Sequence, residues 1–267
     1  MEVIIKMTKN NLRALLLDMD GVLWRDTQPI GDLPGNLQRA DDLGLQLAFV
    51  TNNATRTVEQ YLEKFRGFGA EPRPEQIFTT AKATARHLAA RYPDGGAVYI
   101  IGERGLQEAL AELHFHHAES ECLAVVAGLD RAFDYEKLQR ASLLIHAGAE
   151  LIGTNPDRTL PSPEGQVPGA GAILAALEAA SGAKATIIGK PERALLDAAM
   201  EQLGVQASES LMVGDRIETD IAAGQKAGCP TALVLSGVTN RQAAEAWRPT
   251  PDYIEEDLAA LLEELDR

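Results

Sequence analysis

The sequence is poor in cysteine, in basic residues and in long apolar runs. Only Cys122 and Cys229 occur among 267 residues, outside any CxxC pair, so neither a disulfide framework nor a cysteine-bound zinc site is indicated. The 25 basic residues face 39 acidic ones, and the net charge of −14 argues against nucleic acid or an anionic membrane as the main partner. The N-terminal stretch, which can start at Met1 or Met7, carries no secretory signal, and no run approaches the ~20 apolar residues of a membrane span. We therefore expect a cytoplasmic protein.

Apolar strand-like segments alternate with amphipathic helix-like segments along the whole chain. This order predicts an α/β fold with a doubly wound parallel sheet. The expected strands cover residues 14–17, 45–50, 97–101, 123–126, 151–152, 186–188, 211–213 and 231–235. The expected helices cover residues 36–43, 58–65, 83–91, 135–141, 173–180, 193–203 and 217–227.

Polar or charged residues follow four of the expected strands. The four stretches are LLLDMDG with Asp18 and Asp20, LAFVTNN with Thr51 and Asn52, TIIGKP with Lys190, and LMVGDRIETD with Asp215 and Asp220. The carboxyl ends of the strands in an open parallel sheet line one crevice, so we expect these residues to meet there.

Each of these stretches also has a purely structural interpretation. Aspartates after a strand form turns readily, and the Thr51–Asn52 pair suits a helix N-cap. Lys190 can be a solvated loop lysine, Asp215 a turn residue and Asp220 a surface charge. Turns alone explain a single stretch of this kind more easily than four of them, each directly after an expected strand.

Phosphoryl transfer gives the set a common chemical purpose. Three carboxylates in one crevice repel one another unless a cation lies between them, and ligands that are all oxygen suit Mg²⁺. One carboxylate can attack phosphorus to form an aspartyl-phosphate, and a second can protonate the leaving group and later deprotonate water. The hydroxyl, backbone N–H and ammonium groups of the second and third stretches would hold the phosphoryl oxygens.

In order and spacing, DMDGVLW, VTNN, GKP and GDRIETDI resemble the four motifs of the haloacid dehalogenase (HAD) superfamily of phosphatases. GTNPD at 153–157 and VLSGV at 234–238 resemble its NagD-like or p-nitrophenylphosphatase group. The resemblance covers essentially residues 12 to 240. It implies a Rossmann-like core with an inserted α/β cap domain.

The resemblance also implies a role for each acidic residue. Asp18 is expected to be the nucleophile and Asp20 the general acid and base. Mg²⁺ would be held by the Asp18 carboxylate, the Asp20 backbone carbonyl and Asp215, with Asp220 bracing the site from behind.

Thr51, Asn52 and Lys190 are implied as the residues that bind the substrate phosphate. Asn155 and Asp157 of GTNPD are implied as cap residues that face the leaving group. An Asn-Pro-Asp turn with no contact to substrate is the alternative interpretation of that stretch.

The resemblance divides the chain into a first core segment at 1–81, an α/β cap at 82–184 and a second core segment at 185–267. The cap is expected to close over the cleft, exclude water and determine substrate choice. It also provides a surface through which a homo-oligomer would form.

Three further features carry structural expectations. Trp24, the last residue of DMDGVLW, either covers the substrate or fills a gap under the cap. His146 lies in an apolar run and is expected in the core. The acidic stretch at 253–267 predicts an amphipathic terminal helix.

The sequence thus predicts a Mg²⁺-dependent phosphomonoesterase that acts on small phosphorylated metabolites. The alternatives are a phosphomutase of the same superfamily and a non-catalytic phospho-acceptor or binding module. Nucleotides, phosphoglycolate, sugar phosphates and pyridoxal phosphate all remain open as substrates. A nucleic acid or a membrane is not expected as a partner.

Overall fold

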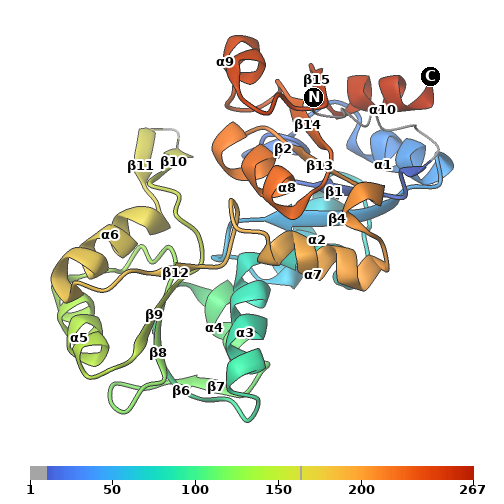
Figure 1. Cartoon of the computed structure of the whole chain (residues 1–267). Helices are drawn as coiled ribbons and strands as arrows, with labels where there is room; N and C mark the ends of the chain where they lie inside the picture. Colours follow the sequence, from blue (N-terminus) through green and yellow to red (C-terminus); the bar gives the residue numbers. More distant parts are fainter. Residues whose placement is uncertain (1–10, 163) are drawn as a thin grey trace, which may run out of the picture. The chain divides into compact units, whose positions relative to one another are not determined.

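The computed structural model describes residues 11–162 and 164–267, so both candidate start residues, Met1 and Met7, lie outside the described part. The chain divides into two compact units (Figure 1). Unit 1 contains the described residues up to Val50 together with Leu62–Phe78 and Leu196–Arg267. Unit 2 contains Thr51–Tyr61 and Thr79–Leu195.

Unit 1 is built on a parallel sheet whose strands lie in the order β15-β14-β13-β1-β4-β5. Their bounds are β1 Ala14–Leu17, β4 Gln46–Thr51, β5 Ile77–Thr79, β13 Ser210–Gly214, β14 Thr231–Val234 and β15 Tyr253–Glu255. Strand β1 has no exposed residue and lies between β13 and β4, with Leu17 opposite Val213 and Phe49. A short two-stranded hairpin, β2 Trp24–Arg25 and β3 Gln28–Pro29, follows β1. The predicted parallel α/β fold is confirmed.

The helices of the described chain mostly begin near the expected residues. Their bounds are α1 Leu33–Asp42, α2 Val58–Gly67, α3 Thr80–Arg91, α4 Arg104–Ala111, α5 Tyr135–His146, α6 Ala170–Ser181, α7 Ala194–Leu203, α8 Ala222–Ala227, α9 Arg241–Ala246 and α10 Leu258–Asp266. The segment expected as one helix at 217–227 starts as a π-helical turn, Ile217–Ile221, before α8. None of the described helices has the length and apolar character needed to cross a bilayer.

The expectation for the last fifteen residues was partly wrong. Tyr253–Glu255 form strand β15, which pairs with β14 so that Tyr253 lies opposite Ala232. The helix begins only after Asp257, whose side chain accepts a hydrogen bond from the Ala260 N–H at 2.9 Å. Pairing with the sheet satisfies the backbone of a segment that sequence periodicity alone assigns to the helix.

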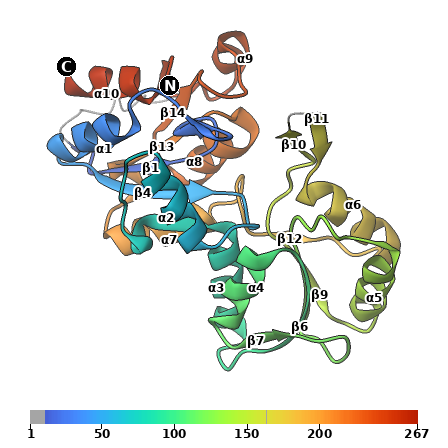
Figure 2. The same ribbon diagram turned by 180° about the vertical axis from the view of Figure 1, so that it is seen from behind.

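Unit 2 has its own parallel sheet, in the order β12-β9-β8-β6-β7. Its strands are β6 Gly96–Ile101, β7 Phe115–His117, β8 Ala124–Ala127, β9 Glu150–Gly153 and β12 Thr186–Ile187. Helices α3 and α4 cover one face of this sheet, and α5 and α6 cover the other (Figures 1 and 2). An antiparallel hairpin, β10 Thr159–Ser162 and β11 Gly165–Pro168, precedes α6.

His146 is not part of the core of unit 2, contrary to expectation. It is the last residue of α5 and is exposed, whereas Ala141, Leu144 and Ile145 of the same helix are buried. Only part of the apolar run is buried, since Leu143 is 56% exposed, and His146 lies on the exposed side of the helix with it.

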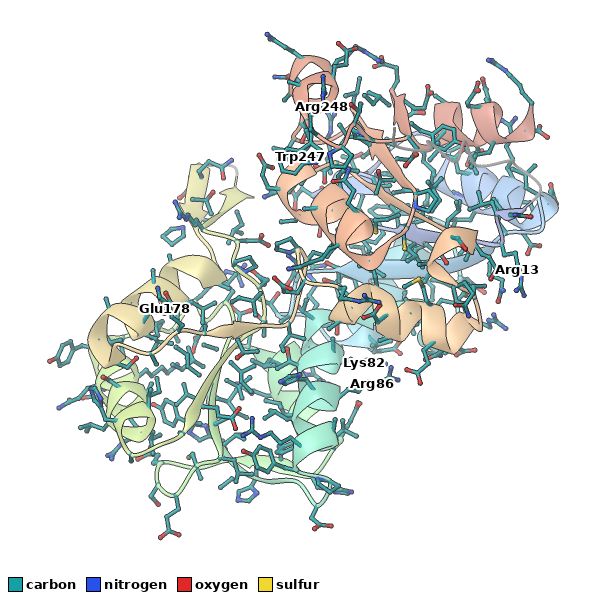
Figure 3. The ribbon with its side chains drawn as sticks, in the orientation of Figure 1. Arg13, Lys82, Arg86, Glu178, Trp247 and Arg248 are labelled. Atoms are coloured by element: carbon teal, nitrogen blue, oxygen red, sulfur yellow. The ribbon has the colours of Figure 1, made fainter. Side chains whose placement is uncertain are left out.

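Glu178 ties the end of α6 to the segment that leads into β12. Figure 3 labels Glu178 on α6. Its carboxylate accepts hydrogen bonds from the Ala185 backbone N–H and the Lys184 ammonium, both at 2.9 Å. Gly182 ends α6 in the left-handed conformation at φ 72°, which a residue with a side chain adopts less readily.

Candidate active site

The two adjacent strands β1 and β13 each end in a buried aspartate. Asp18 directly follows β1 and Asp215 directly follows β13, and they are 8% and 1% exposed. The Asp18 N–H donates to the Val213 carbonyl at 2.9 Å, which continues the parallel pairing past the end of β1. Because both strands run in the same direction, their carboxylates emerge at the same end of the sheet.

Asp18, Asp215 and Asp220 form a cluster in which one carboxylate oxygen from each residue lies within 4.8 Å of the others. Asp220 is 1% exposed, so the surface-charge interpretation of this residue is wrong. Its Oδ2 accepts hydrogen bonds from the backbone N–H groups of Asp215 at 3.1 Å and Arg216 at 3.0 Å. Asp220 therefore fixes the loop that carries Asp215.

A second loop holds Asp215 from the other side. The Val238 N–H donates to Asp215 Oδ2 at 2.8 Å, and the Thr239 N–H donates to the Asp215 carbonyl at 3.1 Å. The Thr239 hydroxyl in turn accepts the Ile217 N–H at 3.3 Å. These bonds explain why Asp215 keeps one orientation at the end of β13.

Glycines surround this carboxylate cluster. A Cβ on Gly21 would lie 2.5 Å from Asp215 Oδ2, and a Cβ on Gly237 would overlap the same side chain. A Cβ on Gly214 would overlap Asp220. Side chains at these positions would displace the carboxylates, so the close approach of bare backbone is part of the site.

The donor set of the cluster fits a hard divalent cation. Three buried carboxylates at this separation repel one another, and a cation between them removes that penalty. The ligand atoms are all oxygen, which favours Mg²⁺ or Ca²⁺ over metals that prefer nitrogen or sulfur.

The side chain of Asp20 has other partners than the carboxylate cluster. Its side chain is 55% exposed, and its Oδ1 accepts a hydrogen bond from the Trp24 indole N–H at 2.8 Å. Trp24 is fully buried within unit 1 beside Phe65 and Phe68, so it fills the interior of that unit. The same Asp20 oxygen lies 3.8 Å from the Lys64 ammonium.

The remaining predicted site residues come together in unit 2 around Asn52. The Asn52 Oδ1 accepts the Lys190 N–H at 2.8 Å, and Nδ2 donates to the Lys190 carbonyl at 2.9 Å and to Asp157 Oδ2 at 3.3 Å. Asn155 is buried and its Nδ2 donates to the Asn52 carbonyl at 2.8 Å. Asn155 Oδ1 accepts the Asp157 N–H at 3.1 Å. This network links VTNN, GTNPD and GKP.

Two structural interpretations of this group do not apply. Helix α2 is capped by Thr57, whose hydroxyl accepts the Gln60 N–H at 3.2 Å, and not by Thr51 or Asn52. Lys190 is 1% exposed, so it is not a solvated loop lysine. Thr51 is 2% exposed, and its hydroxyl accepts a hydrogen bond from the Asn53 N–H at 3.1 Å.

Sequence reasoning missed several residues that support these two groups. Thr80 donates its hydroxyl to the Asn52 carbonyl at 2.7 Å, and a Cβ on Gly189 would lie 2.6 Å from Asn52 Oδ1. Ser236 donates its hydroxyl to the Gly21 carbonyl at 2.7 Å. The resemblance of VLSGV to the family pattern indicated the loop that contains Ser236. No local pattern in the sequence indicated a role for Thr80.

Comparison with known proteins agrees with this architecture. A model described as haloacid dehalogenase-like hydrolase matches residues 15–116, and a second HAD-hydrolase-like model matches residues 187–261. The chain is 39% identical over 230 residues to the 5'-nucleotidase YutF of Bacillus subtilis, covering 86% of this chain and 90% of that protein.

Two solved structures are similar over nearly the whole chain. The p-nitrophenyl phosphatase from Archaeoglobus fulgidus has a TM-score of 0.89 at 32% identity, covering 95% of this chain and 99% of that one. The glycerol phosphate phosphatase from Mycobacterium tuberculosis, in complex with calcium, has a TM-score of 0.87 at 33% identity, covering 95% and 75%.

These matches define the class of protein. The chain belongs to the haloacid dehalogenase-like hydrolases, as its motifs predicted. The enzyme class predicted from the sequence, a phosphatase of this family in its NagD-like group, is confirmed.

Proposed function

We propose that the protein is a Mg²⁺-dependent phosphomonoesterase that hydrolyses small phosphorylated metabolites through an aspartyl-phosphate on Asp18. The observation that carries the proposal is the buried cluster of Asp18, Asp215 and Asp220 at the carboxyl ends of β1 and β13. In a hydrolase of this family, a carboxylate that shares a cation site with two others is placed to meet a phosphate group.

Asp18, Asp215 and the Asp20 backbone carbonyl would hold the Mg²⁺, with Asp220 keeping its bonds to the loop. When bound, the cation offsets the negative charges of the carboxylates and of the phosphate, which otherwise repel each other. The glycines around Asp215 leave the space in which these ligands can approach one another.

The chain's own residues then account for the chemistry. An Asp18 oxygen attacks phosphorus, and the bond from phosphorus to the leaving oxygen breaks while Asp20 gives that oxygen a proton. Asp20 next takes a proton from water, whose oxygen attacks the phosphorus of the aspartyl-phosphate. Inorganic phosphate leaves and the Asp18 carboxylate is restored.

The Asn52-centred group of unit 2 is proposed to bind the phosphoryl oxygens. The Thr51 hydroxyl, the Asn52 backbone N–H and the Lys190 ammonium supply the donors that stabilise charge on the transferring group. Thr51 is the last residue of β4 and, like Lys190, is buried. The buried position of Lys190 strengthens its electrostatic effect because water screens it less.

Substrate choice is proposed to depend on the inserted segment predicted at 82–184, including Asn155 and Asp157 on the side of the leaving group. The relatives are named for a nucleotide, for p-nitrophenyl phosphate and for glycerol phosphate, which supports phosphate monoesters as the class without selecting one. Association of two copies through this segment is a further prediction, measurable by light scattering.

The proposal is tested by release of inorganic phosphate from a panel of phosphate monoesters, ranked by kcat/KM. We expect many turnovers per enzyme with Mg²⁺ present and none for Asp18→Asn. A single stoichiometric uptake of phosphate would instead identify a phospho-acceptor module. Isomerisation of the substrate without phosphate release would identify a phosphomutase.

A further inference from the structure

Asp20 Oδ1 is contacted by two groups that can only donate hydrogen bonds. The Trp24 indole N–H lies 2.8 Å from this oxygen, and the Lys64 ammonium lies 3.8 Å from it. The Lys64 nitrogen also lies 4.2 Å from the centre of the Trp24 ring, within the range of a cation–π interaction. The three side chains thus form one contact group, the Asp20–Trp24–Lys64 triad.

The donor side of this triad is held rigidly inside unit 1. Trp24 is fully buried, packs edge-on against Phe65 with ring centres 4.9 Å apart, and contacts Phe68 at 5.8 Å. Its carbonyl accepts the Gly21 N–H at 2.8 Å, which closes the turn after Asp20. Lys64 is only 14% exposed. By contrast, the Asp20 side chain is 55% exposed and would rotate freely without these partners.

Neither an indole N–H nor an ammonium has a lone pair that can accept a proton from a carboxylic acid. Both contacts are made by Oδ1, which accepts the indole hydrogen bond and faces the ammonium. Together they fix the orientation of the carboxyl group and therefore the direction in which Oδ2 points.

We propose that Trp24 and Lys64 are positioning residues that hold Asp20 Oδ1 and so fix the orientation of the Asp20 carboxyl group, with Oδ2 as the oxygen that exchanges the proton. The inference rests on the proposed function, in which Asp20 is the acid and base. In the first half-reaction, Oδ2–H gives its proton to the leaving oxygen as the bond from phosphorus to that oxygen breaks. In the second half-reaction, Oδ2 takes a proton from the attacking water, so the carboxyl group ends as it began.

Loss of the indole N–H leaves the carboxyl group free to rotate, so that neither oxygen is held toward the reacting group. The consequence depends on the leaving group, because a poor leaving group needs the proton more than a good one. A packing defect, in contrast, lowers the rates for all leaving groups by one factor. The ratio of kcat/KM values for two substrates separates the two effects.

The test compares p-nitrophenyl phosphate, which has an acidic leaving group, with phenyl phosphate, whose leaving group needs protonation. For Trp24→Phe, which keeps a ring but removes the N–H, we expect kcat/KM to fall about tenfold with phenyl phosphate and about twofold with p-nitrophenyl phosphate. Lys64→Met should change the ratio of the two kcat/KM values in the same direction. Lys64→Arg, which keeps the positive charge, should have the wild-type ratio.

Phe68→Leu is the matched control, because it disturbs the packing of the same indole without touching Asp20. We expect it to lower the melting temperature and to keep the wild-type substrate ratio. Equal losses on both substrates in Trp24→Phe, or a changed ratio in Phe68→Leu, would overturn the inference. If Trp24→Phe does not fold, the Lys64 variants carry the same test.

A second readout needs no activity. The chain has two tryptophans, Trp24 and Trp247, so two indole N–H signals are expected by NMR, and Trp247→Phe assigns them. Asp20→Asn should shift the Trp24 signal and leave that of Trp247 in place; no shift would refute the hydrogen bond. A wild-type enzyme that hydrolyses neither ester would refute the proposed function, whereas normal hydrolysis with an unchanged ratio in Trp24→Phe refutes only the positioning role.

Discussion

The side chain of Asn52 and the backbone of Lys190 form a closed pair of hydrogen bonds. Asn52 Oδ1 accepts the Lys190 N–H at 2.8 Å, and Asn52 Nδ2 donates to the Lys190 carbonyl at 2.9 Å. Both peptide groups of the lysine are thereby held by one amide from a distant part of the sequence. The buried ammonium of Lys190 is consequently carried by a backbone that has little freedom.

Asn52→Ala is expected to weaken phosphate binding through this loss of support. We expect kcat/KM to fall roughly 10–100-fold, because the two part-buried hydrogen bonds that hold the Lys190 backbone disappear. The inhibition constant of inorganic phosphate should rise in parallel. Asn53→Ala is the control, because the Asn53 side chain accepts hydrogen bonds from Thr55, from its N–H at 2.9 Å and its hydroxyl at 2.7 Å. An equal effect of the two variants would contradict the prediction.

Gly21→Ala is expected to raise the Mg²⁺ requirement of the enzyme. The new Cβ would lie 2.5 Å from Asp215 Oδ2 and push this carboxylate away from Asp18. We expect the Mg²⁺ concentration for half-maximal activity to rise at least about tenfold. A change of this size corresponds to the weakening of one charge-assisted contact. Gly44→Ala provides the comparison, since Gly44 also has a positive φ of 75° but no atom within 4 Å of the new Cβ. It should destabilise the fold by about 1 kcal/mol and leave the Mg²⁺ requirement unchanged.

Removal of the metal is expected to abolish activity, and Mg²⁺ should restore it better than Ca²⁺, whose larger coordination sphere misplaces the attacking carboxylate. Mg²⁺ should also raise the melting temperature of the wild type, because a ligand that binds only the folded state stabilises it. Asp215→Asn should lose this thermal shift, while its metal-free form melts above the metal-free wild type because one repulsive charge is gone. Full activity in excess chelator would refute the assignment of the carboxylate cluster.

Asp18 and Asp20 should differ in the covalent species that their variants accumulate. Asp18→Asn removes the attacking oxygen, so no phosphoenzyme should form. Asp20→Asn still permits attack on p-nitrophenyl phosphate, whose leaving group needs little protonation, but slows hydrolysis of the aspartyl-phosphate by ~10²–10⁴-fold. Intact-mass spectrometry after rapid quenching should therefore detect a phosphate adduct on Asp20→Asn only. An adduct on Asp18→Asn would overturn the assigned roles.

Glu178 should make stability depend on pH in the acidic range. The Ala185 N–H and then the Lys184 ammonium lower the pKa of Glu178 below its ordinary value of 4.5. A lowered folded-state pKa contributes stability above that ordinary value, and the contribution is lost as the pH falls through the folded-state value. Glu178→Gln should thus cost roughly 0.5–1 kcal/mol near neutral pH, and the difference should vanish in strong acid. Urea unfolding across pH measures it, with the exposed Glu201→Gln as the control.

The fold was predictable where a segment carries its own signal. Strand β1 was expected at the residues that form it, because four buried apolar residues are followed at once by an aspartate. The short helices α4 and α9, the sheet strands β5, β7 and β15, and the hairpins β2–β3 and β10–β11 were missed. Tyr253–Glu255 adopt the strand only because β14 offers unpaired backbone groups, a long-range cause that no local pattern contains.

The site was predictable to the same extent. Residues at strand ends could be found from the polarity change after each strand, as at Asp18 and Asp215. Their partners could not, since the Asp220 bonds to the loop and the Lys64 contact with Asp20 depend on how separate segments pack. Trp24 had two open interpretations, and the sequence did not indicate that it packs inside unit 1 against Phe65, near the end of α2.

The position of β1 between β4 and β13 has a consequence for biosynthesis. β4 follows soon after β1 in the chain, whereas β13 emerges from the ribosome only after the whole of unit 2, roughly 10–30 s later at typical translation speeds. Until then β1 is an apolar edge strand, open to pairing with other nascent chains. A truncated product that ends before Ser210 would carry the Asp18 carboxylate on such an edge and would lack Asp215 altogether. Interrupted translation would therefore yield an aggregation-prone fragment with no metal site.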